Sequence, residues 1–173
     1  MKIKIVMLFL CVLMQGCSTV DDYMLGKDNT PKPKDMEQIQ SKIKMSQNWS
    51  VAVAKPHKTN DYLKLKPVII GDNVYIADVS GIIQNVSANN GRIKWTAKLK
   101  HAIVSGPTVA DGYIAVGTSA STLALFRQAD GQKLWQIKVS GEVLSPPAIS
   151  NKKVIAKTID GKVFAFDVTS GKQ

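Results

Sequence analysis

Side chains that could carry out catalysis are few in this 173-residue chain, and they do not cluster in the sequence. The two histidines, His57 and His101, each stand alone in loop-like surroundings, so a histidine metal site or a hydrolytic triad lacks the groups it needs. Four aspartates recur where turns are expected, namely Asp72, Asp111, Asp130 and Asp160, and a short carboxylate that bonds to its own backbone explains those positions. The sequence therefore predicts no catalytic residue, no metal site and no cofactor-binding residue.

A single cysteine is placed for a covalent modification. The chain starts with basic residues and an apolar stretch of about ten residues, which is too short for a helix to span a bilayer because a span needs about 20. The stretch leads to Gly16-Cys17, which resembles the cleavage box of bacterial lipoproteins. We therefore expect residues 1–16 to be a lipoprotein signal peptide and Cys17 to be lipidated. An ordinary secretory signal with an unmodified Cys17 is the alternative.

The residues around Cys17 indicate where the protein would reside. The only other cysteine, Cys11, would leave with the signal, so the mature chain would carry no free thiol in the oxidising periplasm. Ser18 follows Cys17, and by resemblance to Gram-negative lipoproteins this implies a lipid-anchored protein on the periplasmic face of the outer membrane. Residues 17–45 are polar beyond the cysteine and contain two prolines, which predicts a tether.

The chain is basic, with a formal charge of +10. Removal of Lys2 and Lys4 with the signal leaves 21 basic against 13 acidic residues, or +8. Such a charge suggests a nucleic-acid binder, but the lysines are scattered over tether and turns without aromatic residues between them, and an exported chain does not meet nucleic acid. We expect a solvated surface that favours anionic lipid headgroups near the anchor, and no nucleic-acid partner.

The rest of the chain is built from a repeat of 40 residues. The pentad Gly-x-x-x-Trp occurs twice at this spacing, and single prolines and glycines keep the same interval. A fixed period of this length means that each unit is a small supersecondary structure whose apolar face is covered only by stacking on its neighbours. The landmarks are Pro67, Pro107 and Pro147, the glycines Gly91, Gly131 and Gly171, and the tryptophans Trp95 and Trp135.

Each repeat reads as four short antiparallel strands. Runs rich in β-forming residues recur at 74–77, 114–117 and 154–157, and Asn-Gly or Asp-Gly turns follow a second, alternating run. Four strands per repeat predict an all-β propeller with blades at about 66–97, 106–137 and 147–173. Each proline is expected at the start of a first strand. The tryptophans and the landmark glycines are expected to dock one blade on the next, with ligand stacking by tryptophan as the alternative.

The propeller region, 46–173, is expected to be incomplete. Trp49 lies in a run, 47–53, that matches the tryptophan strand of a blade although no blade precedes it. We expect this strand to complete a blade built by the other end of the ring, with an inserted loop at 54–64. The chain stops at Gln173, two residues before the next expected tryptophan, which predicts a fragment of a longer propeller.

The blade sequence resembles that of a known family. Residues 165–172, Ala-Phe-Asp-Val-Thr-Ser-Gly-Lys, resemble the blade signature of propellers related to pyrroloquinoline-quinone enzymes. This implies an eight-bladed parent, with about two and a half to three blades present here. The segment 23–34 resembles the linker of propeller lipoproteins of the outer-membrane β-barrel assembly machinery. That resemblance implies a non-enzymatic scaffold that helps to insert β-barrel proteins into the outer membrane.

The resemblance also implies partners. They are the central β-barrel subunit of the machinery, through its periplasmic repeat region, and unfolded outer-membrane proteins as clients. The family binds the central β-barrel subunit through a loop with the sequence Leu-x-Leu-Arg. This chain has no counterpart of that loop, so no partner-binding residue is assigned. Two alternatives stay open: a fragment of a quinone-dependent dehydrogenase, whose adjacent cysteine pair is missing here, and an envelope propeller lipoprotein that binds glycans.

Lipidation can be tested directly at the cysteine. Cys17→Ala is expected to abolish incorporation of labelled palmitate and to move the protein out of the membrane fraction, because several acyl chains on one residue are what would hold it there. Cys11→Ala is the matched control and should leave labelling unchanged. Continued labelling of the Cys17→Ala protein would show that Cys17 is not the lipidated residue.

Overall fold

The computed structural model describes residues 33–36, 43–53 and 65–173. Cys17, His57, the predicted inserted loop at 54–64 and most of the predicted tether lie outside these residues. All the described strands lie within the unit Met45–Gln173. Among the described residues, no helix is both long enough and apolar enough to cross a membrane.

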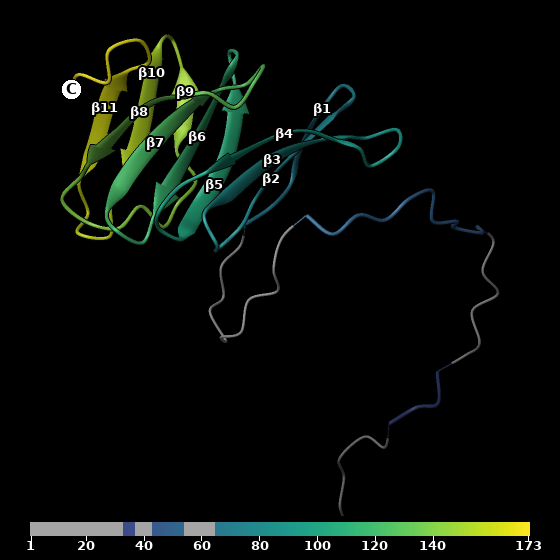
Figure 1. Cartoon of the computed structure of the whole chain (residues 1–173). Helices are drawn as coiled ribbons and strands as arrows, with labels where there is room; N and C mark the ends of the chain where they lie inside the picture. Colours follow the sequence, from purple (N-terminus) through teal and green to yellow (C-terminus); the bar gives the residue numbers. More distant parts are fainter. Residues whose placement is uncertain (1–32, 37–42, 54–64) are drawn as a thin grey trace, which may run out of the picture. The chain divides into compact units, whose positions relative to one another are not determined.

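The described strands form three antiparallel sheets in which sequence neighbours pair (Figure 1). The first sheet contains β1 (Val68–Ile70), β2 (Asn73–Ala77), β3 (Ile82–Ser87) and β4 (Ile93–Lys98). The second contains β5 (Ile103–Ala110), β6 (Tyr113–Thr118), β7 (Thr122–Arg127) and β8 (Lys133–Lys138). The third contains β9 (Ala148–Ser150), β10 (Lys153–Lys157) and β11 (Val163–Asp167). The prediction of an all-β chain of four-stranded antiparallel blades is confirmed.

Tight turns with left-handed residues join the first two strands of the later sheets. Ala110 pairs with Tyr113, so the β5–β6 loop is the two residues Asp111 (φ 51°) and Gly112 (φ 82°). The β9–β10 loop is likewise Asn151 and Lys152, both with positive φ. Two successive left-handed residues are what a hairpin turn needs to match the twist of its strands, and Asp, Asn and Gly tolerate that conformation best.

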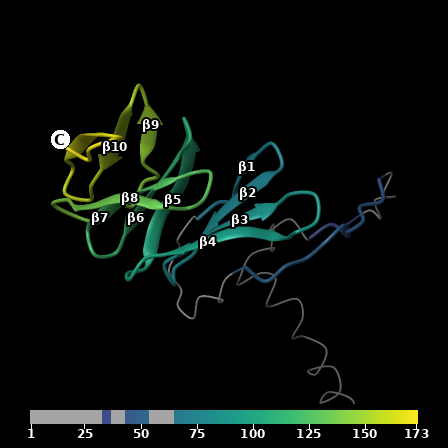
Figure 2. The ribbon, with the colours of Figure 1, turned by 45° about the horizontal axis from the view of Figure 1, so that its top comes forward.

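The core lies between the sheets, which stand side by side in both views (Figures 1 and 2). Successive residues of β6 point to opposite faces, so Ile114 and Val116 pack towards the first sheet and Ala115 towards the third. The cluster between the first two sheets is Tyr75, Ala77, Ile83, Leu99, Ile103, Ile114, Val116, Ala124 and Phe126. The second sheet thus buries both of its faces, which explains why its middle strands are nearly continuous apolar runs.

The third sheet is covered on one face only within the described chain. Ile155 and Val163 are 38% and 66% exposed, whereas their counterparts one repeat earlier, Ala115 and Leu123, are fully buried. The opposite face of the third sheet, with Val154 and Phe166, packs on the second. The same strand pattern is therefore buried or exposed according to whether a neighbouring sheet lies against it.

Three tryptophans make the same contact from one unit to the next. Each indole Nε1 donates a hydrogen bond to a carbonyl oxygen near the β-turn of the following unit: Trp49 to Ala88 at 2.7 Å, Trp95 to Gln128 at 3.2 Å and Trp135 to Val168 at 2.9 Å. Trp135 also lies against Phe166 of the third sheet, with ring centroids 6.3 Å apart. Each indole thus joins its unit to the next through a hydrogen bond.

A glycine lies beneath each indole. Gly91, Gly131 and Gly171 all have positive φ, and a Cβ added to them would lie 2.7, 2.5 and 3.1 Å from the nearest atom of Trp49, Trp95 and Trp135 respectively. Any other residue would be strained in its backbone and would push the ring away. This double requirement explains the fixed spacing of glycine and tryptophan in the repeat.

One expectation about strands was wrong. Pro107 does not start its strand but lies inside β5, where the register with β6 shifts between Ser105 and Thr108, and such an irregularity accommodates the missing N–H. Residues 47–53 have no pairing strand within the described part of the chain, and their completion of a blade built by the other end of the ring stays a prediction. Trp49 nevertheless occupies the same position against its glycine as the other two tryptophans.

The indole contact can be tested with two glycine substitutions. Gly131→Ala should lower the free energy of unfolding by about 1–3 kcal/mol more than Gly112→Ala, because both residues are left-handed but only Gly131 has an indole where the methyl group would go. Equilibrium urea unfolding of both variants and of the unsubstituted chain measures the difference. Equal losses would mean that Trp95 moves aside without cost.

A second test concerns pH and the β10–β11 turn. Hydroxyl groups of Thr158 and Ser140 and the ammonium group of Lys162, 3.1 Å away, hold the pKa of Asp160 well below its ordinary value. A pKa that is lower in the folded state stabilises the fold above the unfolded pKa, and this contribution disappears as the pH falls through the folded value. The melting temperature of Asp160→Asn should therefore be below that of the unsubstituted chain at pH 7, with a smaller difference at pH 3. A difference that does not change with pH would contradict this.

Candidate functional site

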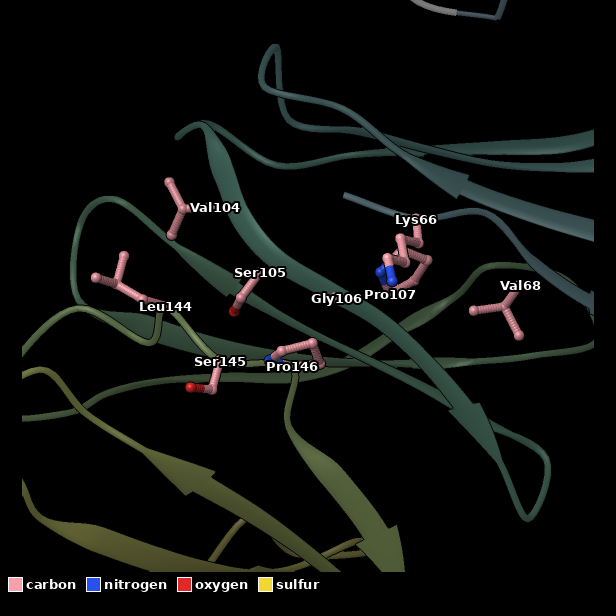
Figure 3. A pocket seen from close by; sticks show the side chains of 9 residues that line it. All are labelled: Lys66, Val68, Val104, Ser105, Gly106, Pro107, Leu144, Ser145 and Pro146. Carbon is pink, nitrogen blue, oxygen red and sulfur yellow. The ribbon is translucent and has the colours of Figure 1, made fainter. Parts of the chain in front are cut away.

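A hollow opens where the first strands of the sheets come together. Its volume is about 360 Å³, and it lies between the segment around Val68, strand β5 and the loop that leads into β9 (Figure 3). Leu144 and Val104 lie at one end in the close-up, and Lys66 and Val68 lie at the other. The lining residues are Lys66, Val68, Val104, Ser105, Gly106, Pro107, Leu144, Ser145 and Pro146. Because the first strands of a propeller surround its axis, this is the axial side of the fold.

The chemistry of this hollow is apolar with one cation. Lys66 supplies an ammonium group, Ser105 and Ser145 supply hydroxyl groups, and the other lining side chains are aliphatic or proline. The Ser105 hydroxyl is buried and has no hydrogen-bond partner within the described residues. The lining has neither a general base nor an activated nucleophile, so the hollow can hold an apolar group but has no machinery to transform it.

A calcium and quinone site does not fit this lining. Calcium takes carboxylate, carboxamide and carbonyl oxygens as ligands, and the hollow has neither an acidic nor an amide side chain. Within the described ranges, no three His, Cys, Asp or Glu side chains are grouped so as to hold a metal ion. The donor set on this axial side therefore differs from the acidic and amide set expected for a quinone-dependent dehydrogenase.

A smaller depression adjoins the hollow. Its volume is about 210 Å³, and it is lined by Leu144, Ser145, Lys157, Thr158 and Ile159, so it shares Leu144 and Ser145 with the larger one. Leu144 is 47% exposed and Ile159 is 65% exposed. We call the two side chains the apolar rim. Large apolar side chains gathered on a surface mark sites of contact with other macromolecules.

The titratable residues singled out in the sequence do not converge. His101 is exposed in the loop between β4 and β5. Asp130 bonds within its own hairpin, to the Gln132 amide at 3.1 Å and to Arg127 at 3.0 Å, and these bonds lower the pKa of its carboxyl group. Asp160 bonds within the β10–β11 turn, to Thr158 and Lys162. Each of these aspartates has a local structural role.

Asp72 differs from the expected turn role. Its carboxylate does not bond to its own turn but accepts hydrogen bonds across the sheet, from Ser87 at 3.2 Å, from the Asn89 amide at 3.2 Å and from Lys94 at 3.3 Å. These bonds outweigh the opposing effect of desolvation and lower the pKa of Asp72. The carboxylate thus ties the β1–β2 turn to the β3–β4 hairpin.

Sequence reasoning missed the hollow and the apolar rim. Pro107 lines the hollow and belongs to the 40-residue series, so one landmark of the repeat lies on the axial side. The apolar rim had no such signal, because Leu144 and Ile159 look like core residues until the sheets are placed. Cys17 lies outside the described residues, and the tryptophans are engaged in docking one unit on the next.

Comparison with known proteins identifies the family. A family model described as outer membrane protein assembly factor BamB matches residues 79–173. The assembly factor of Legionella pneumophila (strain Paris) is 63% identical over 125 residues, which are 72% of this chain and 33% of that protein. The crystal structure of BamB from Moraxella catarrhalis superposes with a TM-score of 0.59 at 26% identity, covering 64% of this chain and 34% of that one.

An enzyme shares the fold at greater distance. A quinohemoprotein alcohol dehydrogenase from Pseudomonas putida superposes with a TM-score of 0.55 at 20% identity, covering 61% of this chain and 19% of the enzyme, and this likeness shows the fold alone. The chain spans about a third of the length of the curated relatives named here. The family match over 79–173, together with the stacked four-stranded sheets, shows that the chain belongs to the BamB family of outer membrane protein assembly factors.

Proposed function

We propose that the protein acts as a non-enzymatic scaffold of the outer-membrane β-barrel assembly machinery. The observation that carries this proposal is the family match over residues 79–173, supported by 63% identity to an assembly factor. The hollow on the axial side, which offers no set of residues for catalysis or for a quinone cofactor, agrees with a binding role.

The proposed location is the periplasmic face of the outer membrane. Lipidation of Cys17 would anchor the chain there, and the polar residues that follow would give the sheets reach from the membrane. Stacked sheets suit a scaffold because their cores are buried between neighbours while the loops at their ends remain free to bind.

The proposed main partner is the central β-barrel subunit, through its periplasmic repeat region, with unfolded outer-membrane proteins as additional clients. The apolar rim supports this proposal. Leu144 and Ile159 are exposed side by side on one depression, and Lys157 lies next to them. Exposed aliphatic side chains beside a cation suit a protein surface that is apolar and acidic.

The experiment is copurification from detergent-solubilised membranes with tagged protein. The unsubstituted chain should recover the central subunit, and Leu144→Asp combined with Ile159→Asp should reduce the amount recovered by about tenfold or more, since a buried charge at the centre of an interface removes its apolar contact. Leu134→Asp, on the outer strand β8, is the matched control and should retain binding. Absence of the central subunit from the unsubstituted sample would refute the proposed function.

A further inference from the structure

A second cleft lies at the other end of the strands from the apolar rim. Its volume is about 460 Å³, and it is lined by the β5–β6 turn, the β9–β10 turn and the residues that follow β11. Strand β10 runs from Lys153 to Lys157, so the cleft beside Lys152 and the apolar rim beside Ile159 are at opposite ends of the third sheet. We call it the turn cleft. Its residues are Asp111, Tyr113, Asn151, Lys152, Val168 and Thr169.

Five side chains with hydrogen-bonding groups line the turn cleft. Within the described part of the chain, no hydrogen bond or ion pair engages the side chains of Asp111, Tyr113, Asn151, Lys152 or Thr169. Asp111 and Lys152 have opposite charges and line the same cleft, yet they do not form an ion pair with each other. The groups are therefore available to a ligand.

The preceding repeat shows that the fold does not require such groups to be free. Asn73 is the counterpart of Tyr113, and its Oδ1 accepts hydrogen bonds from Lys94 at 2.7 Å and from Asn85 at 3.1 Å. Gln128, the counterpart of Val168, donates to the Tyr75 hydroxyl at 2.9 Å. Asn73 and Gln128 are thus engaged in hydrogen bonds within the protein, whereas the polar side chains of the turn cleft are not.

The hydrogen-bonding side chains of the turn cleft indicate which class of ligand it can bind. The carboxylate of Asp111 only accepts hydrogen bonds, the ammonium group of Lys152 only donates them, and the carboxamide and the phenol do both. An anion would meet Asp111 and a cation would meet Lys152, so a neutral ligand with several hydroxyl groups satisfies these groups best. Tyr113 is only partly buried against the core, so its ring supplies an apolar surface for the C–H face of a sugar ring, whereas Val168 is 2% exposed and offers almost none.

We propose that the turn cleft binds a neutral saccharide ring. Its volume lies in the range of about 300–1,000 Å³ that is typical of small-ligand sites. The hydroxyl groups of the ring would donate to Asp111 and accept from Lys152 and Asn151, while its C–H face packs on the ring of Tyr113. This inference goes beyond the scaffold function and does not depend on it, because the two sites use different residues at opposite ends of the sheets.

The test is titration of the chain with neutral tetrasaccharides, one of β-1,4-linked N-acetylglucosamine and one of α-1,4-linked glucose, followed by NMR of the backbone amides. Saturable shifts confined to residues 111–113, 151–152 and 168–169 are expected with at least one of them. Binding of the chain to purified cell-wall glycan in a sedimentation assay distinguishes a polymeric source from a free sugar. Glucose and glucose 6-phosphate are titrated as a neutral and an anionic monosaccharide, and glucose 6-phosphate should bind more weakly than glucose.

Two variants separate binding from folding. Asp111→Gly keeps the left-handed turn and removes the carboxylate, and should raise the Kd about tenfold or more, as expected for a lost hydrogen bond to a charged group. Tyr113→Phe keeps the ring against the core and removes only the hydroxyl group, and should raise the Kd about threefold. Asn89→Gly, in a turn outside the cleft, is the control and should bind as the unsubstituted chain does.

The outcomes are decisive in both directions. Saturable binding that Asp111→Gly and Tyr113→Phe weaken, with amide spectra still dispersed as in a folded protein, supports the site. The proposal is overturned if no neutral saccharide gives saturable shifts, if the shifts fall outside the turn cleft, or if glucose 6-phosphate binds more tightly than glucose. Because the copurification experiment uses the apolar rim, failure of the saccharide site would leave the proposed scaffold function standing, and the reverse also holds.

Discussion

Burial of both faces of each sheet is the constraint on which the rest of this structure depends. The middle strands of each unit are apolar on successive residues, so one neighbour can cover only half of their side chains. Leu123 is fully buried between two sheets, whereas Val163, its counterpart in the third sheet, is 66% exposed. At about 25 cal/mol per Å² of apolar surface removed from water, stacking therefore supplies a large part of the driving force for folding.

The indole and glycine pair decides how the sheets stack. Apolar burial is not directional, so it would allow neighbouring sheets to slide over each other. Each tryptophan donates one hydrogen bond to a specific carbonyl oxygen and seats its ring on a left-handed glycine, as Trp95 does on Gln128 and Gly131. The repeat therefore fixes the packing geometry. The hollow, the smaller depression and the turn cleft are lined by residues that differ between units.

The errors of sequence reasoning have physical causes. Pro107 was placed at a strand start because a proline cannot donate to a ladder, but a shift of register inside β5 accommodates it equally well. Asp72 was assigned to its own turn, and only the folded sheet brings Ser87 and Lys94 to its carboxylate.

By itself, the sequence determined the all-β class, the 40-residue unit, the turns and the docking role of the tryptophans, because strand alternation, left-handed turn residues and the glycine beneath an indole are local or periodic requirements. Only the tertiary structure decided which apolar side chains are core and which form the apolar rim, as with Leu144 and Ile159. It alone also showed that Asp111 and Lys152 meet at one cleft without pairing. Such features depend on which units stand next to each other, and a periodic sequence gives successive units nearly the same local pattern whatever surrounds them.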